Sequence, residues 1–454
     1  MKSIMVLAVV PAVLGSVSIA RADDGYSYFA LSASAGGIVM DLPDAGGSFE
    51  GAGIDDQNDL LLGGTLGLSA AAGLGEINGL AAYIGLTGFV SYAAGDFDKT
   101  HSFTGPGVVI IQGGAGPNLG SIEISTSSGG VGGNGAAVVG LSVSNTNPQA
   151  GNLVASAPAS STNPGGGAQD VAFVEPEGES FLWGGSQTEA TDGTYRSAAY
   201  AAIADTNGGV FIAAGDLTGL SITTQYRTEV LYAGGDLTFG LSGARDSNMV
   251  LQGYAGPSYR YLAQRNSTSS EIVVDVPEFV EDSVEFPIFG MQSTEELTAH
   301  YMGGVIGASV TMPVTDNSAL TLGGELGGYY TLAALESSGT YMVEGGSIGE
   351  PNPAPYPLQI VEAEGDGEDG ETFALAARGT AVYTVAMGNN MQISFAGTVD
   401  YLSRVAQPGV NATVTGYDGT DDGTVSYVSG GDSDGISWGD MIAFGGSVSL
   451  TGQF

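Results

Sequence analysis

The sequence predicts an all-β fold, a single up-and-down antiparallel barrel, on three observations. Apolar and polar residues alternate with a period of two in one segment after another, which is typical of strands whose two faces meet different surroundings. Short and long connections between these segments alternate along the chain. No apolar run reaches the ~18 residues that a membrane-spanning helix needs, although 43% of the residues are hydrophobic and the mean hydropathy is +0.16.

Strand-like alternation bounded by turn residues defines twelve segments. They are 26–40, 60–74, 79–95, 194–204, 209–218, 224–244, 248–264, 298–314, 319–335, 371–387, 390–405 and 437–454. In 319–335, Leu320, Leu322 and Leu326 share one face, while Thr321 and Glu325 share the other. The weakest segments are 209–218 and 224–244, because Gly234-Gly235-Asp236 fits a bulge or a turn, so ten and fourteen strands stay open beside twelve.

The connections fall into two kinds that alternate along the chain. The short ones are 75–78, 205–208, 245–247, 315–318 and 388–389, and the long ones are 41–59, 96–193, 265–297, 336–370 and 406–436, with a shorter one at 219–223. Segment 96–193 is rich in Gly, Ser, Asn and Pro, and a connection of that length is normally functional or disordered. It could enter a lumen, fold outside as a small β-domain, or remain flexible.

The N-terminus predicts export. Lys2 precedes a short apolar core at 4–14, and Ala20-Arg21-Ala22 is a small-x-small cleavage site. These features predict a signal peptide at 1–22 and a mature chain, 23–454, that begins at Asp23. The chain has no cysteine, which removes thiol chemistry and disulfides from consideration.

The formal net charge of −39 excludes nucleic acid as a partner, because proteins that bind it are basic. Acidic runs beside glycines suggest weak calcium sites, since hard cations take oxygen ligands. The metal candidates are Asp418, Asp421, Asp432 and Asp434. None of these runs has the complete pattern of a calcium-binding loop, so solvated loop charge is the alternative, and no other cofactor is predicted.

The last predicted strand resembles a strand of a known class of protein. Segment 437–454 places Ile442, Phe444, Val448 and Leu450 on one face and ends on the aromatic Phe454. Behind a secretory signal, this resembles the closing strand of a bacterial outer-membrane β-barrel. The resemblance implies an outer-membrane location, termini and short turns in the periplasm, long extracellular loops, and contact with outer-membrane lipid and lipopolysaccharide.

Aromatic residues near segment ends fit the girdles of such barrels. Tyr92, Tyr401 and Trp438 fall on the lipid side near the expected outer rim, and Phe454 falls at the periplasmic rim. Because Tyr, Phe and Trp also favour strands in general, ordinary strand propensity is the alternative explanation.

Charged residues inside the segments are the candidates for a channel lining. Parity places most of them on the polar, lumenal face, where charge ladders set solute selectivity. The candidates are Arg227, Glu229, Arg260, Glu325, Arg378, Asp400 and Arg404. Paired charges that fill a narrow lumen are the alternative.

The sequence therefore predicts a porin-like channel for passive diffusion of small hydrophilic solutes. The alternative is a structural or adhesive surface-display barrel with a filled lumen, in which 96–193 is the exposed element. No enzyme activity is expected. His300 lies at the outer rim, where outer-membrane phospholipases place their catalytic histidine, but Met302 stands where their serine is required. No interface patch predicts an oligomeric state.

Overall fold

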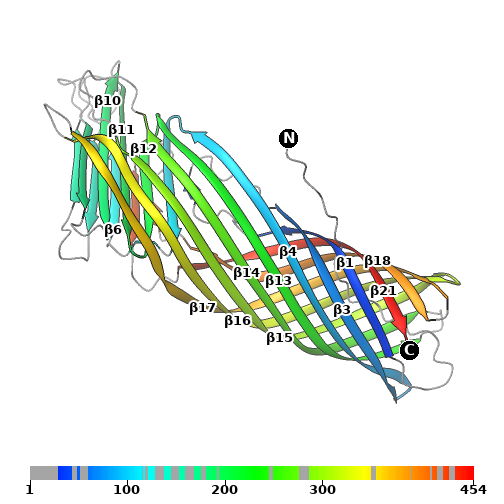
Figure 1. Cartoon of the computed structure of the whole chain (residues 1–454). Coiled ribbons are helices and arrows are strands. Elements are labelled where there is room, and N and C mark those ends of the chain that lie inside the picture. The colour runs from blue at the N-terminus through cyan, green and yellow to red at the C-terminus, as the bar shows by residue number, and fades with distance from the viewer. Residues whose placement is uncertain are drawn as a thin grey trace.

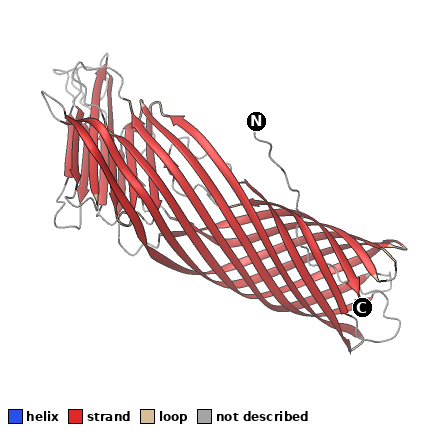
Figure 2. Cartoon of the chain, viewed as in Figure 1, coloured by secondary structure: helices blue, strands red, loops and turns tan. Residues whose placement is uncertain are grey.

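The computed structural model describes most of residues 23–454. The described residues are 29–42, 49–51, 60–114, 116–117, 121–127, 138–144, 153–158, 168–174, 180–191, 194–244, 249–275, 286–348, 354–388, 390–409, 412–416, 423–428 and 435–454. The predicted signal peptide lies outside them. Figure 2 shows that the described part is built from strands. No helix in the described part is long and apolar enough to cross a membrane.

Ten strands close into a barrel in the order β1-β21-β18-β17-β16-β15-β14-β13-β4-β3 (Figure 1). Their bounds are β1 Phe29–Asp41, β3 Leu60–Ile77, β4 Leu80–Ser102, β13 Leu220–Ala244, β14 Val250–Val274, β15 Ile288–Thr315, β16 Ser318–Ile348, β17 Ala354–Ala386, β18 Met391–Pro408 and β21 Ile436–Gln453. Every pair is antiparallel, and β1 pairs with β21 from Ala30–Gln453 to Asp41–Ile442. Ring closure satisfies the backbone polar groups that an open edge would leave unpaired.

All twelve predicted segments are strands, and ten of them form the barrel. The antiparallel barrel is therefore confirmed. It has ten strands, which is one of the three numbers that the alternation left open. The other two, β11 (Thr194–Asp205) and β12 (Gly208–Asp216), belong to a second sheet. Because they form an adjacent up-and-down pair, their removal from the ring keeps the number of barrel strands even.

The short connections 75–78 and 315–318 lie at the end of the barrel that holds the C-terminus (Figure 1), whereas 205–208 joins β11 to β12 in the second sheet. The two-residue connection from β3 to β4 consists of Asn78 and Gly79, whose φ angles are 53° and 78°. Two residues with positive φ make the hairpin turn that matches the twist of the flanking strands, and Asn-Gly is its preferred sequence.

The outward face of the barrel is apolar. Exposed side chains include Leu66, Leu68, Phe395, Val448 and Leu450, as the alternation predicts for a lipid-facing surface. The apolar belt runs around the whole barrel. Soluble proteins rarely expose an apolar surface this large to water, so the belt indicates contact with lipid hydrocarbon.

A tyrosine girdle, defined as Tyr92, Tyr259, Tyr330 and Tyr401, borders the apolar belt on the side away from the short turns. Each girdle tyrosine lies opposite an apolar residue of the neighbouring strand. Its hydroxyl forms a hydrogen bond with the polar side chain that lies two residues further outward on that strand. The pairs are Tyr92–Glu229 at 3.0 Å, Tyr259–His300 at 2.7 Å, Tyr401–Asp440 at 2.9 Å, and Tyr330–Glu371. The register partners themselves are apolar: Leu231, Met302, Phe373 and Ile442.

The girdle confirms the rim positions predicted for Tyr92 and Tyr401. The prediction for Trp438 is wrong, because its side chain is partly buried against the apolar cluster inside the barrel. The β18–β21 ladder has a register shift between Leu402 and Val405, just before the pair of Ala406 with Trp438. Counting alternate residues along β21 cannot reveal such a shift.

The barrel strands β4 and β13 to β17 continue far beyond the girdle, and two further sheets pack over them (Figure 1). The second sheet has the order β2-β5-β12-β11-β10-β9, with β2 Phe49–Gly51, β5 Pro106–Gly114, β9 Ala168–Val174 and β10 Phe181–Thr191. The third has the order β19-β20-β6-β7-β8, with β6 Ser121–Ser127, β7 Val138–Ser144, β8 Leu153–Pro158, β19 Ala412–Thr415 and β20 Gly423–Val428. We call the two sheets and the strand extensions the outer β-structure.

Two apolar cores hold the outer β-structure together. One joins the inner face of the barrel extensions, including Phe289 and Tyr341, to Trp183 and Phe211 of the second sheet. The other joins the opposite face of the second sheet to the third sheet. The second sheet is thus the middle of three layers, which explains why β12 is buried along its whole length. Most of the predicted loop 96–193 lies in this folded structure.

Gly256 is required by a close approach between β13 and β14. A Cβ there would collide with the carbonyl oxygen of Leu237, and the β13–β14 ladder is interrupted opposite Gly256 and Pro257. We expect Gly256→Ala to destabilise the barrel by about 1–3 kcal/mol, because overpacked sites must shift backbone. Urea unfolding in lipid vesicles measures it. Gly253→Ala on the same strand, where a Cβ meets nothing within 4 Å, should be neutral, and equal effects of the two changes would refute this reading.

Tyr427 of β20 has a buried hydroxyl without a hydrogen-bond partner among the described residues. Burial raises the pKa of this phenol, and the Asp205 and Glu368 carboxylates raise it further. A phenol whose pKa is raised in the folded state stabilises the fold fully below its ordinary pKa of 10.0, and this contribution is lost as the pH rises above that value.

We therefore expect Tyr427→Phe to be neutral or stabilising at pH about 8, because phenylalanine leaves no hydroxyl unsatisfied. Above pH about 10 the variant should resist alkaline unfolding better than the parent. Tyr329→Phe is the control, because it removes a 2.9 Å hydrogen bond to Ser258 and should cost about 1 kcal/mol. A loss of stability in Tyr427→Phe at neutral pH would show that the hydroxyl has a partner.

Candidate functional site

The bore of the barrel is the candidate site, and its lining changes along the axis. Toward the short turns it holds a polar cavity. Above the cavity, five charged side chains meet in a network, and an apolar layer and a lid follow toward the outer end.

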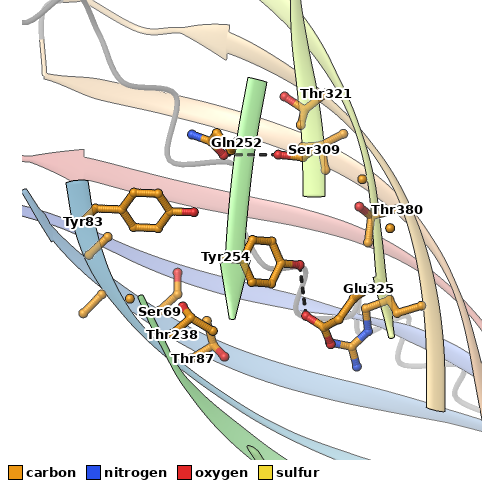
Figure 3. Close-up of a pocket in the computed structure, with 17 residues that line it drawn as sticks. Ser69, Tyr83, Thr87, Thr238, Gln252, Tyr254, Ser309, Thr321, Glu325 and Thr380 are labelled. Carbon is orange, nitrogen blue, oxygen red and sulfur yellow. Dashed lines mark hydrogen bonds between the residues drawn. The ribbon is translucent and has the colours of Figure 1, made fainter. Parts of the chain in front are cut away.

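The cavity has a volume of about 90 Å³. Hydroxyl and amide side chains from many strands point into it, among them Thr87, Thr238 and Gln252 (Figure 3). Tyr83 and Tyr254 flank it, and Glu325 and Arg378 line it from the charged network. Such a cavity has room for a few water molecules, which need polar partners of this kind.

The charged network consists of Asp236, Arg260, Glu325, Arg378 and Asp400, from five strands. Arg260 Nη1 lies 2.6 Å from Asp236 Oδ1, and Arg260 Nη2 donates to Asp236 Oδ2 at 3.1 Å. Arg378 pairs with Asp400. Both Arg260 and Asp236 are almost fully buried, with side chains 3% and 2% exposed. Bidentate pairing is needed at such depth, because an unpaired buried charge is costly.

The network is tied to its surroundings at several points. Asp236 also accepts hydrogen bonds from Ser258 at 2.6 Å and Thr87 at 3.1 Å. The guanidinium carbons of Arg260 and Arg378 lie 5.3 Å and 5.7 Å from the centroid of the Phe89 ring, within range of a cation–π attraction.

Glu325 makes the longest ion pair of the network. Its Oε2 accepts a hydrogen bond from Tyr254 at 3.0 Å, while its Oε1 lies 3.8 Å from Arg260 Nη2. With three carboxylates and two guanidiniums, the network carries a formal charge of −1 when all its groups are ionised.

An apolar layer crosses the bore above the network. All ten barrel strands contribute to it a side chain that is no more than 2% exposed. These side chains are Met40, Leu61, Ala93, Val230, Leu262, Leu297, Leu335, Ala374, Leu402 and Met441. Protein interiors packed in this way leave few voids as large as a water molecule, so the layer, together with Val405 and Ala406 in the same cluster, closes the bore.

The outer ends of β18 and β21 form a lid over this layer, which we define as residues 403–409 and 435–439. The β17–β18 ladder ends at Ala376–Leu402, while β18 and β21 stay paired as far as Pro408–Ile436. The pair thus leaves the wall after a register shift at Leu402/Val405, where Arg404 has a φ of 57°. Val405 and Ala406 are fully buried in the apolar cluster.

Polar side chains hold the lid from the opposite wall and from above. Gln264 of β14 donates to the carbonyl of Ala406 at 3.0 Å, and the Tyr301 hydroxyl of β15 donates to that of Arg404 at 3.4 Å. Gln112 of β5 donates to the carbonyl of Gly409 at 3.0 Å. The second sheet therefore contacts the lid through β5.

The structure brings four of the seven predicted lumen residues together: Arg260, Glu325, Arg378 and Asp400. The other three lie elsewhere. Arg227 and Glu229 pair at 2.6 Å on the outward face of β13, and Arg404 is exposed beyond the bulge. The lumenal placement of these three was wrong.

Asp236 and the partly buried Phe89, which lies against the charged network, were not among the predicted lumen residues. The Gly234-Gly235-Asp236 run looked like a bulge or turn, but β13 continues through it with Asp236 facing the bore. The signal that would have identified Asp236 is its parity with Val230 and Tyr232, both of which are buried inside the barrel.

The calcium candidates Asp418, Asp421, Asp432 and Asp434 lie outside the described residues. In the part that the structure describes, no group of three or more His, Cys, Asp or Glu residues is placed to hold a metal ion. His300 lies on the outward face and pairs with the phenol of Tyr259.

No family model matches the sequence, and no curated protein matches it. Among solved structures, the chain is similar to a Pseudomonas aeruginosa FadL homologue, with 9% identity, a TM-score of 0.20, and coverage of 94% of this chain and 89% of that chain. It is also similar to the P. putida toluene transporter TodX, with 9% identity, a TM-score of 0.16, and coverage of 95% and 90%. Scores this low carry no argument about function. By its closed antiparallel ring, apolar exterior and tyrosine girdle, the chain is an outer-membrane type β-barrel.

Proposed function

We propose that this protein is a barrel of the bacterial outer membrane whose bore is closed and which anchors the outer β-structure at the cell surface. The apolar layer carries the proposal. A diffusion pore for hydrophilic solutes needs a continuous polar path, whereas here all ten strands direct buried apolar side chains into one contiguous cluster inside the barrel.

The outer β-structure supports the same reading. Its three layers have their own apolar cores, and two of its sheets take little part in the barrel wall. A folded body of this kind is an effective display element, because its loops are held on a rigid scaffold. This proposal corresponds to the surface-display alternative, with the folded strands of 96–193 as part of the exposed element.

Single-channel recording of the refolded full chain in planar bilayers tests the closed bore. We expect no conductance steps at moderate voltage, with a general porin in the same bilayer as a positive control. Regular steps from the unmodified protein would overturn the proposal and favour diffusion of small hydrophilic solutes.

Transport remains a second candidate, and one observation favours it. The polar cavity and the charged network occupy the bore below the apolar layer, and a purely structural barrel has no need of buried charges. Conduction would require the lid to leave the bore, which a lid variant tests directly.

A further inference from the structure

A polar depression lies on the outward face of the barrel, beyond the tyrosine girdle. It spans β4, β13, β14 and β15 and has a volume of about 860 Å³, within the ~300–1,000 Å³ typical of small-molecule sites. Because the girdle marks the end of the apolar belt, the depression lies where the headgroups of the outer leaflet would lie.

The register shows how the outward face changes with distance from the apolar belt. First come Tyr92 and Leu231, which pair with each other. The next outward residues bear charges: Glu229, Arg265 and Glu296 form one row across three strands.

The rows that line the depression follow. Asp96, Arg227 and Ser267 form the first of them. Asp98, Gln225, Ser269 and Gln292 form the second, across four strands. The surface thus passes from apolar to ionic and then to mixed polar, the order in which a glycolipid presents acyl chains, linking groups and sugars.

The lining of the depression is chemically suited to sugar hydroxyls. Within the described part of the chain, the side chains of Asp98, Gln225, Ser269 and Gln292 make no hydrogen bond or ion pair, so their polar atoms are available. Amides and hydroxyls both donate and accept, and carboxylates accept, which matches hydroxyls that do both.

The charge balance disfavours a bare phosphate as the group recognised. Arg227 is already engaged by Glu229 at 2.6 Å, and Asp96 lies 3.8 Å from the same guanidinium. Arg265 lies 3.5 Å from Glu296. Carboxylates therefore outnumber guanidiniums here, and uncharged sugar hydroxyls meet less repulsion in the depression than a phosphate group does.

We infer that this depression binds the saccharide headgroup of an outer-leaflet glycolipid, with Gln225, Ser269 and Gln292 as its uncharged contacts. The inference rests on the outer-membrane placement proposed above. The acyl chains of the same lipid would lie against the apolar belt below the girdle, so that membrane anchoring and headgroup recognition act on one molecule.

The test uses the refolded full chain in detergent micelles with three probes: lipopolysaccharide that retains its core sugars, lipid A without them, and the core oligosaccharide released from the lipid. We expect the first probe to bind most tightly and to raise the unfolding temperature. Lipid A should bind about tenfold more weakly, a difference of about 1.4 kcal/mol. Ser269→Trp, which fills the depression, should reduce binding of the complete glycolipid to the level of lipid A.

Ser338→Trp is the matched control, because Ser338 is an exposed serine of β16 that does not line the depression. It should bind as the parent does. Equal binding by the parent and Ser269→Trp overturns the inference, as does binding of the free oligosaccharide as tight as that of the glycolipid. Loss of all binding on chelation of divalent cations also overturns it, because that result indicates ion bridges instead.

These outcomes are separate from those of the proposed function. Ser269→Trp should leave refolding into bilayers and the absence of conductance unchanged. A parent protein that stays closed and inserts normally but shows no preference for core sugars contradicts the saccharide site alone.

Discussion

Arg260→Ala is expected to destabilise the folded barrel by about 3–5 kcal/mol, because it leaves Asp236 as a buried charge without its cation. The two side chains are almost fully buried and share two short contacts. Hydrogen bonds from Ser258 and Thr87 remain but cannot replace a guanidinium. Reversible urea unfolding in lipid vesicles, followed by tryptophan fluorescence or circular dichroism, measures the loss.

Arg265→Ala provides the matched control. Its pair with Glu296 spans 3.5 Å, and both side chains are more than half exposed, so removal should change the stability little. The double change Arg260→Met with Asp236→Leu should recover most of the loss, since replacing both members of a buried ion pair by apolar groups is often neutral. Similar losses from Arg260→Ala and Arg265→Ala would show that the network is hydrated.

Val405→Asp is expected to produce conductance in a protein that is otherwise closed. Val405 is fully buried in the lid, and an unpaired carboxylate there costs several kcal/mol in apolar surroundings. Moving the lid out of the bore relieves that cost, because the carboxylate then reaches water. Planar-bilayer recordings should show intermittent steps for the variant and none for the parent.

Val428→Asp controls for the added charge, because Val428 is 59% exposed on β20, away from the bore. It should remain silent. If Val405→Asp does not refold, the milder Val405→Ser gives the same comparison at a smaller polar cost. A folded lid variant as silent as the parent would mean that the apolar layer closes the bore without the lid.

Much of the barrel could be predicted because one physical requirement governs it. Lipid on one face and packed polar groups on the other impose a period of two. Parity therefore places Arg260, Glu325, Arg378 and Asp400 correctly on the inner face. The requirement is local to each strand and needs no knowledge of its neighbours.

Assigning faces by alternate residues is wrong where a strand leaves the lipid or where its alternation is interrupted. Arg227 and Glu229 lie beyond the apolar belt, where water replaces lipid and both faces of β13 can carry polar residues. At Arg404 a bulge inserts a residue and changes the face of those that follow. Such an irregularity depends on the lid packing against β14 and β15, which is a tertiary effect.

A small outer β-domain was one of the alternatives left open for 96–193, but the sheet that each strand joins could not be predicted. β11 and β12 have the length and turn of a barrel hairpin, and nothing in alternation says which sheet a strand joins. The continuous burial of β12 indicates a strand covered on both faces, but only the assembled layers show what covers it.

A crystal structure of the full chain in a lipidic phase, at a resolution that shows ordered water, tests the closed bore most directly. It should show continuous side-chain packing among Met40, Leu262 and Met441, with water confined to the cavity beside Glu325 on one side and the outer surface on the other. An unbroken file of water molecules running past Leu262 from one end of the barrel to the other would contradict it.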